Sequence, residues 1–328
     1  MNDAIQALEA GQTFLTAGGT ETYLLFQQGF PLREGCAFEV FDDEAAWTAL
    51  QGDYLGPIFD TARRGGYGLL LDTLVWRAQS DFFARLGYAP EDLERFNRLA
   101  VERTREAAVA WHRANPGGGD LRVILAGDVG PRGDGYKVSD RSLTPEGAQD
   151  YHCTQIATLA RAGAELVCGL TLTTVAEAIG VARAAREHGL PVVISPTVET
   201  AGTLPDGTPL GELIRRVDDA TACAPLFYMV NCAHPTHVAP TLARAKAEGA
   251  DWLRRFQGIR ANASRKSHVE LDESPELDRG DPHELGREIA ELQRAHGLRV
   301  LGGCCGTDAE HIAAIAAAAG RGAAGAVA

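Results

Sequence analysis

The sequence alternates short apolar runs with longer amphipathic segments, and this alternation recurs eight times along 328 residues. A strand that is buried on both faces of a parallel sheet reads as a continuous apolar run. Eight β/α units in one chain of this size predict a single closed (β/α)8 barrel. The predicted strands are residues 13–17, 67–74, 122–130, 165–172, 191–198, 226–232, 256–263 and 299–306.

The segments between these runs have the pattern of helices. Residues 92–113 and 147–163 are the clearest, and the second has a start signal before it and a glycine at its end. Two stretches do not fit the repeat: residues 31–65 are predicted to form an elaborated first loop, and residues 267–286 are too polar for the core. Since no long low-complexity linker interrupts the chain, a single domain over residues 1–328 is expected.

The amino-acid composition and net charge exclude some classes of function. The net charge of −13 gives no basic footprint for nucleic acid or for an anionic membrane, and no apolar run approaches the length of a membrane span. Seven cysteines without regular spacing, and no secretory signal at the start, predict reduced thiols in a cytoplasmic protein. Small molecules are therefore the expected partners, and a homo-oligomer is compatible with these features.

Three cysteines lie at predicted strand ends. Cys304 and Cys305 stand in a glycine run after the eighth strand, and Cys232 ends the sixth. When only the local sequence around them is considered, the paired thiols are as consistent with buried packing as with metal ligation. Active groups of such barrels lie at the carboxyl ends of the strands, however, and strands six and eight are near neighbours around a closed ring. The three sulfurs can thus meet, and three thiolates make a zinc site with one open position. The other four cysteines are expected to pack.

Several motifs then carry a resemblance to a known family. The segment "GGCCGT", with "VNCAHP" upstream, resembles the homocysteine S-methyltransferase family, which includes the betaine-dependent and S-methylmethionine-dependent enzymes and the homocysteine module of methionine synthase. Further similar segments are "AGGTETYLLFQQG", "GDVGPRGDGY" and "GIRANASRKSHVELDE". The resemblance implies a (β/α)8 barrel and a Zn²⁺ ion held by Cys232, Cys304 and Cys305.

The same resemblance implies a chemistry for the three thiolates. Binding to zinc removes the proton of an incoming thiol at neutral pH, and three anionic ligands keep that thiol electron-rich. It can then attack the methyl group of a small sulfonium or quaternary ammonium donor. The chain leaves no room for appended folate or cobalamin domains, so a small donor is expected. Homocysteine, giving methionine, is the default acceptor of the family.

The sequence departs from the family where the amino group of homocysteine would be held. Ala17 stands where an aspartate is usual, and Leu170 stands where a glutamate is usual. Glu199, one strand further on, is the predicted replacement. Two alternatives therefore stay open beside the homocysteine reading: the same fold and zinc site acting on another thiol or a selenol, or a barrel that binds zinc or thiols without catalysis.

Further candidate substrate contacts lie at strand ends. Arg77 could clamp a carboxylate in two-point fashion, and Trp76 could pack against a methylated cation, but each could instead serve the barrel mouth alone. Asn231 could bond a zinc-bound sulfur, the substrate or only a neighbouring strand. The remaining candidates, for close approach to a ligand and for a strand-end carboxylate, are Gly18, Gly19 and Asp72.

Overall fold

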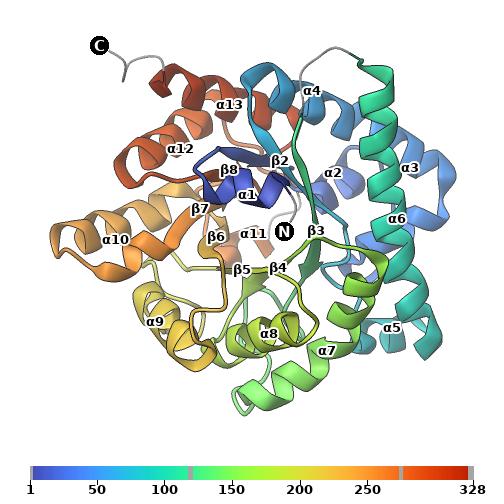
Figure 1. Ribbon diagram of the computed structural model, residues 1–328, viewed down its shortest axis with the longest axis horizontal. Coiled ribbons are helices and arrows are strands. Elements are labelled where there is room, and N and C mark those ends of the chain that lie inside the picture. The colour runs from blue at the N-terminus through green and yellow to red at the C-terminus, as the bar shows by residue number, and fades with distance from the viewer. Residues whose placement is uncertain (1–2, 117–120, 273–275, 324–328) are drawn as a thin grey trace.

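A computed structural model describes residues 3–116, 121–272 and 276–323. Eight parallel strands pair in chain order and close between β8 and β1 (Figure 1). Every predicted strand is confirmed, with bounds that differ by one to three residues at most ends. The strands are β1 Phe14–Thr16, β2 Gly68–Asp72, β3 Val123–Val129, β4 Leu166–Leu172, β5 Val192–Pro196, β6 Phe227–Ala233, β7 Phe256–Ala261 and β8 Val300–Gly303.

Helices form a ring around the barrel (Figure 1). The two clearest predictions hold: α6 and α7 cover the predicted segments, and Gly163 ends α7 in the left-handed conformation with φ 88°. The α-helices are α1 Asp3–Glu9, α2 Thr20–Phe26, α3 Glu44–Leu50, α4 Gly56–Gly65, α5 Ser80–Leu86, α6 Pro90–Ala114, α7 Pro145–Ala162, α8 Val175–Glu187, α9 Leu210–Thr221, α10 Pro235–Ala247, α11 His268–Asp272, α12 Pro282–His296 and α13 Ala309–Ala323.

The segment predicted as an elaborated first loop is mostly helical. It contains the short helical turns η1 (Arg33–Gly35), η2 (Ala37–Asp42) and η3 (Gln51–Leu55) as well as α3 and α4; a fourth turn, η4 (Asp251–Arg255), precedes β7. The reason is an aromatic cluster that the segment shares with its neighbours. Phe38 of η2 stacks on Phe83 with ring centroids 4.7 Å apart, and it also contacts Phe96. The segment therefore packs as a layer outside the barrel.

Apolar side chains fill the barrel interior at the end where the strands begin. Apolar side chains from alternate positions of the strands form one buried cluster, and Ala4, Ile5 and Leu8 of α1 join it. Figure 1 shows α1 lying across the centre of the barrel, so this helix closes the end at which the strands begin. The opposite end, where the strands finish, is left for a site.

None of the helices in the described residues is both long enough and apolar enough to cross a bilayer.

Candidate functional site

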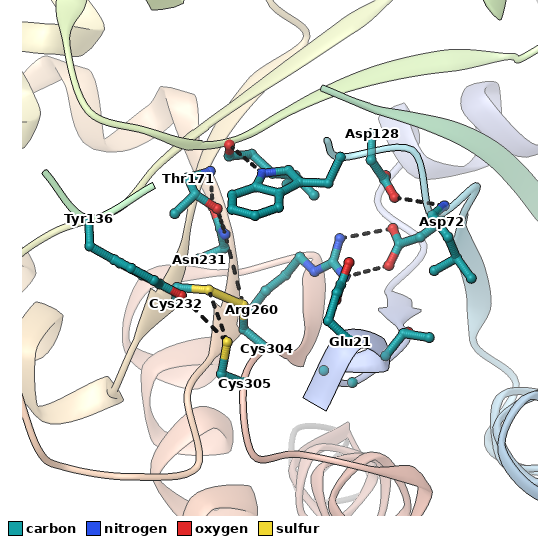
Figure 2. A pocket seen from close by; sticks show the side chains of 16 residues that line it. Glu21, Asp72, Asp128, Tyr136, Thr171, Asn231, Cys232, Arg260, Cys304 and Cys305 are labelled. Carbon is teal, nitrogen blue, oxygen red and sulfur yellow. Dashed lines mark hydrogen bonds and ion pairs between the residues drawn. A yellow bond between two sulfur atoms is a disulfide. The ribbon is translucent and has the colours of Figure 1, made fainter. Parts of the chain in front are cut away.

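A cavity opens at the carboxyl ends of the strands, where barrels of this architecture place their chemistry. Figure 2 shows thiols at one end of this cavity and acidic side chains around a guanidinium at the other. The cavity is lined by Gly18, Gly19, Thr20, Glu21, Asp72, Leu74, Trp76, Asp128, Tyr136, Leu170, Thr171, Asn231, Cys232, Arg260, Cys304 and Cys305.

Three sulfur atoms gather at the thiol end. The Sγ atoms of Cys232, Cys304 and Cys305 all lie within 4.8 Å of one another, as the sequence predicts. Cys232 and Cys304 are joined by a disulfide across 72 residues of chain, and Cys305 Sγ lies 3.9 Å from Cys232 Sγ. The expectation of seven reduced thiols is therefore wrong for one pair. The convergence that would serve a metal also brings two sulfurs within bonding distance.

Cys232 is held in an unusual backbone conformation. Its φ of 53° lies in the left-handed region, which residues other than glycine rarely adopt and which persists only where the surroundings enforce it. Its carbonyl oxygen accepts hydrogen bonds from His268 Nε2 at 2.7 Å and from Asn262 Nδ2 at 3.1 Å. Both donors come from the chain that follows β7, so this segment sets the orientation of the first cysteine.

Residues 267–286, after β7, were predicted to be too polar for the core, and this prediction is wrong at His268 and at Leu285 of α12, which are both buried. His268 begins the short helix α11 and is buried. Its ring packs against Tyr136, with centroids 4.4 Å apart, and its Nδ1 lies 3.2 Å from Glu199 Oε1. Because both ring nitrogens have polar partners, the histidine is buried without leaving a polar atom unsatisfied.

The turn that carries Cys304 and Cys305 is pinned on both sides. Cys304 N donates to Ala261 O at 2.8 Å, and Cys305 O accepts from Ala263 N at 3.0 Å. On the other side the loop after β1 approaches so closely that a side chain there would collide. A Cβ on Gly19 would meet the carbonyl of Cys304, and one on Gly18 would lie 2.7 Å from Thr307 O. The two glycines thus allow the backbone to pack against the cysteine turn.

Tyr136 covers the free thiol. Its hydroxyl lies 3.5 Å from Cys305 Sγ, and it comes from the long loop after β3. Burial raises the pKa of Cys305, and burial also raises the pKa of Tyr136, to which the neighbouring thiol adds. Without a metal, both groups are therefore neutral near pH 7.

Asn231 of β6 forms hydrogen bonds with residues near the ends of β4 and β5. Its Oδ1 accepts from Thr171 N at 2.8 Å and from Ser195 Oγ at 2.7 Å. Its Nδ2 donates to Thr171 Oγ1 at 2.8 Å and lies 4.0 Å from Cys304 Sγ. Asn231 is thus a strand-end amide beside the sulfur of Cys304, and its bond to a zinc-bound sulfur or to the substrate stays a prediction. Thr171, with φ 59°, is another strand-end residue in the left-handed region.

The other end of the cavity is charged. Arg260 of β7 forms a buried two-point ion pair with both carboxylate oxygens of Asp72, at the end of β2. Two more carboxyl groups lie nearby, Glu21 in the first turn of α2 and Asp128 at the end of β3 (Figure 2). Burial is the main cause that raises the pKa of Glu21 and of Asp128, and the charge of Asp72 adds to both shifts.

Two predicted substrate contacts lie outside the lining of this cavity. Arg77 donates to Glu34 O, and its guanidinium carbon lies 4.8 Å from the ring centroid of Trp76. Glu199 contacts His268, behind Cys232. The structure does bring Trp76 to the cavity, where its Nε1 donates to Leu170 O at 3.2 Å. The contacts of Arg77 and Glu199 with a substrate stay predictions.

Sequence reasoning missed some lining residues that a simple signal identifies. Side chains alternate along a strand, so a residue two places after an inward apolar residue also points inward. Leu70 and Ala126 belong to the interior cluster, and two residues after them follow Asp72, which was predicted, and Asp128, which was missed. Arg260 pairs in register with the inward Asn231 of β6. Glu21 and Tyr136 come from a helix and a loop, for which alternation gives no signal.

The thiol set fits a zinc ion. Four sulfur or nitrogen ligands around zinc, with Zn–S bonds of about 2.3 Å, put tetrahedral sulfurs about 3.8 Å apart. The 3.9 Å between Cys232 Sγ and Cys305 Sγ meets this spacing. Cys304 becomes available as a third thiolate once its disulfide with Cys232 is reduced. Three protein ligands leave one position open, as catalytic sites require.

Together, a closed (β/α)8 barrel and a thiol cluster in its carboxyl-end cavity define a barrel enzyme with a thiolate centre. The family model for homocysteine S-methyltransferase matches residues 69–319. The chain therefore belongs to the homocysteine S-methyltransferase family and is a methyltransferase enzyme, as its motifs predict.

Solved structures agree on the fold. The homocysteine methyltransferase MmuM from Escherichia coli in its oxidized form is similar with a TM-score of 0.74 at 21% identity, over 96% of this chain and 99% of that one. The metallated form of the same protein gives a TM-score of 0.68 at 21% identity over the same shares of both chains. At this identity the likeness establishes the barrel architecture over nearly the whole described chain.

Proposed function

We propose that this protein is a zinc-dependent S-methyltransferase that moves a methyl group from a small sulfonium or quaternary ammonium donor to a thiol. One observation carries the proposal: three cysteine sulfurs from two strand ends converge in a cavity of small-molecule size. Homocysteine is the default acceptor in this family. The family match and the metallated MmuM structure support both the reaction class and the presence of a metal.

The residues that line the cavity would have separate roles in this reaction. Cys232, Cys304 and Cys305 would hold the ion, which when bound would supply a deprotonated thiol at neutral pH. The acceptor sulfur forms a bond to the methyl carbon. The donor's bond to that carbon breaks, its electron pair stays on the donor sulfur or nitrogen, and the thiol proton goes to solvent. Trp76 and Tyr136 line the cavity with aromatic rings, which attract a methylated cation.

A second acceptor class is favoured by one observation. Leu170 lines the cavity at the end of β4, where the family usually has a glutamate. An apolar side chain at this position cannot pair with an ammonium group. A thiol or selenol other than homocysteine is therefore the alternative acceptor, with the same zinc site.

The test of the function is a matrix of donors and acceptors. Reduced, zinc-loaded protein is incubated with S-methylmethionine or betaine and with a panel of thiols that includes homocysteine, and methylated products are identified by mass spectrometry. We expect at least one pair to give a methyl thioether and the zinc-free protein to give none. Binding of thiols without any methylated product from any pair would indicate a non-catalytic barrel.

The contacts behind Cys232 lead to a first prediction. Asn262→Ala removes one of the two hydrogen bonds to the Cys232 carbonyl, so the left-handed backbone of this ligand loses support. We expect zinc affinity of the reduced protein to fall by about 10–100-fold, the usual effect of removing a group that orients a metal ligand. Competition with a chromogenic chelator measures this affinity.

A matched control for this variant is Asn115→Ala. Asn115 caps α6 and donates to Trp111 O, far from the thiols in the chain and in the fold. Its affinity for zinc should equal that of the wild type. Equal affinities in Asn262→Ala and the wild type would show that the carbonyl contact has no part in metal binding.

The pH dependence of zinc binding follows from the thiols. A metal displaces the thiol proton, and burial raises the pKa of Cys305, so protons compete strongly near neutral pH. Below that pKa, each fall of one pH unit should cost about tenfold in affinity for this thiol alone. Zinc affinity should therefore fall steadily from mildly basic to mildly acidic pH in a chelator titration. A flat profile would contradict ligation by thiolates.

A further inference from the structure

A second group of metal-ligating side chains lies in the ring of helices. Cys153 of α7, with Glu187 and His188 at the end of α8, each offer one ligand atom, and these three atoms all lie within 4.8 Å of one another. Figure 1 shows α7 and α8 side by side in the ring. The three residues do not line the cavity that holds the other cysteines, so methyl transfer there gives them no role.

The sulfur and the imidazole of this group are already in contact. Cys153 Sγ lies 3.0 Å from His188 Nε2. A tetrahedral zinc ion, with bonds of about 2.3 Å to sulfur and about 2.0 Å to nitrogen, holds such a pair about 3.5 Å apart. Both side chains are partly exposed, so rotation about their side-chain bonds can widen the gap to this distance.

The carboxylate of the group is held by a neighbouring side chain. Gln149, one helical turn before Cys153 on α7, donates from Nε2 to Glu187 Oε2 at 2.8 Å. In metal sites, hydrogen bonds of this kind fix the direction of a ligating carboxylate. The third ligand is therefore oriented before any ion binds.

The surroundings of the group favour a cation. Burial raises the pKa of the Cys153 thiol, and the negative charges of Glu187 and Asp150 raise it further. The group also lies at the carboxyl end of α8, where the helix dipole places partial negative charge. A protonated thiol is a poor nucleophile, which argues against a reactive cysteine. A divalent ion, in contrast, releases the thiol proton to solvent and gains three ligands.

We propose that Cys153, Glu187 and His188 form a second metal site, which binds Zn²⁺ and joins the end of α8 to α7. A set of sulfur, imidazole and carboxylate ligands suits zinc, whereas Ca²⁺ and Mg²⁺ prefer oxygen ligands alone. The site is open to solvent and has three protein ligands, so water supplies the fourth. Binding should therefore be weak enough for dialysis to remove this ion and leave the one in the cavity.

Cobalt titration tests the site directly, because thiolate-bound Co²⁺ absorbs in the near ultraviolet and Zn²⁺ does not. Reduced, zinc-loaded protein is dialysed against a weak chelator and then titrated with Co²⁺, which binds such ligands less tightly than zinc and leaves the cavity ion in place. We expect one further ion per chain and a thiolate-to-cobalt band. The difference between the spectra of wild type and Cys153→Ala isolates this site, whatever the occupancy of the cavity.

Variants of each ligand should weaken the site. Cys153→Ala should lose the band, and His188→Ala should bind Co²⁺ at least about tenfold more weakly, since loss of a ligand costs no less than loss of an orienting group. Gln149→Ala, which removes only the orienting bond, should weaken binding by about tenfold. All of these side chains are at least partly exposed, so the variants should fold.

The matched control is Cys223→Ala. Cys223 is an exposed thiol that joins no group of three potential ligands within the described part of the chain, so its loss should leave the band unchanged. Equal cobalt spectra for wild type and Cys153→Ala would overturn the proposal. Loss of the band in Cys153→Ala with full binding in both His188→Ala and Glu187→Gln would indicate a single thiol rather than a site, and would overturn it as well.

Bound zinc should also stabilise the fold, because the three ligands are assembled only in the folded chain. Zn²⁺ at about 100 times its Kd should raise the midpoint of thermal unfolding of the dialysed wild type by about 4 °C. The rise in His188→Ala at the same concentration should be at most about half as large. Equal shifts in the two proteins would contradict a zinc link between α7 and α8.

Discussion

Replacing Cys232 with alanine is expected to remove both the bound zinc and the methyl-transfer activity. The sulfur of Cys232 lies 3.9 Å from that of Cys305 and is bonded to that of Cys304, so it stands at the centre of the cluster. Loss of a direct ligand should lower zinc affinity by more than the roughly 10–100-fold that an orienting residue costs. Elemental analysis after dialysis should fall from one zinc per chain to near zero.

The matched control for this experiment is Cys153→Ala. Cys153 lies on α7, and its sulfur is 3.0 Å from His188 Nε2, in a group with Glu187 that is separate from the cavity. This variant should keep one zinc per chain and full activity. If Cys232→Ala retained stoichiometric zinc, the assignment of the sixth-strand ligand would be wrong. If Cys153→Ala lost it, the ion would lie between α7 and α8.

The largest expected loss of stability comes from Arg260→Met. The variant leaves Asp72 buried without its partner and removes a guanidinium that lines the cavity with Asp128 and Glu21. Breaking a buried ion pair from one side costs about 3–5 kcal/mol, because an uncompensated charge stays in the interior. Urea unfolding of the reduced protein, followed by circular dichroism, should show this loss in the free energy of unfolding.

A second variant separates the broken pair from loss of packing. The double replacement Arg260→Met with Asp72→Leu removes both charges and should recover most of the stability. The surface variant Arg98→Met, which breaks an exposed pair with Glu102, should cost less than about 0.5 kcal/mol. A cost for Arg260→Met as small as that of Arg98→Met would contradict the account of the charged end.

The fold was predictable because its signal is repeated. Eight apolar runs in the sequence correspond to the eight strands of the barrel, and each run is long enough to be recognised. The segment 31–65 was misread because its helices are short and are stabilised by aromatic contacts with α5 and α6. Such contacts join residues that are distant in the chain, so a local pattern does not reveal them.

The site was predictable in part, for the same physical reason. The cysteines carry their own chemistry, and their places at strand ends bring them together in any closed barrel of this register. The buried pair of Arg260 and Asp72 joins strands on different sides of the barrel, so neither residue signals its partner. The polar neighbours of His268 in the sequence give no sign that its ring is buried against Cys232, where its Nε2 donates to the carbonyl oxygen.

In the proposed site, three cysteine thiolates hold the metal and leave one position for the acceptor thiol. X-ray absorption at the zinc edge of the reduced, zinc-loaded protein tests it most directly. We expect three sulfur ligands at about 2.3 Å in the free protein and four after addition of an acceptor thiol. A free protein with fewer than three sulfur ligands, or a sulfur count that does not change at saturating thiol, would contradict it.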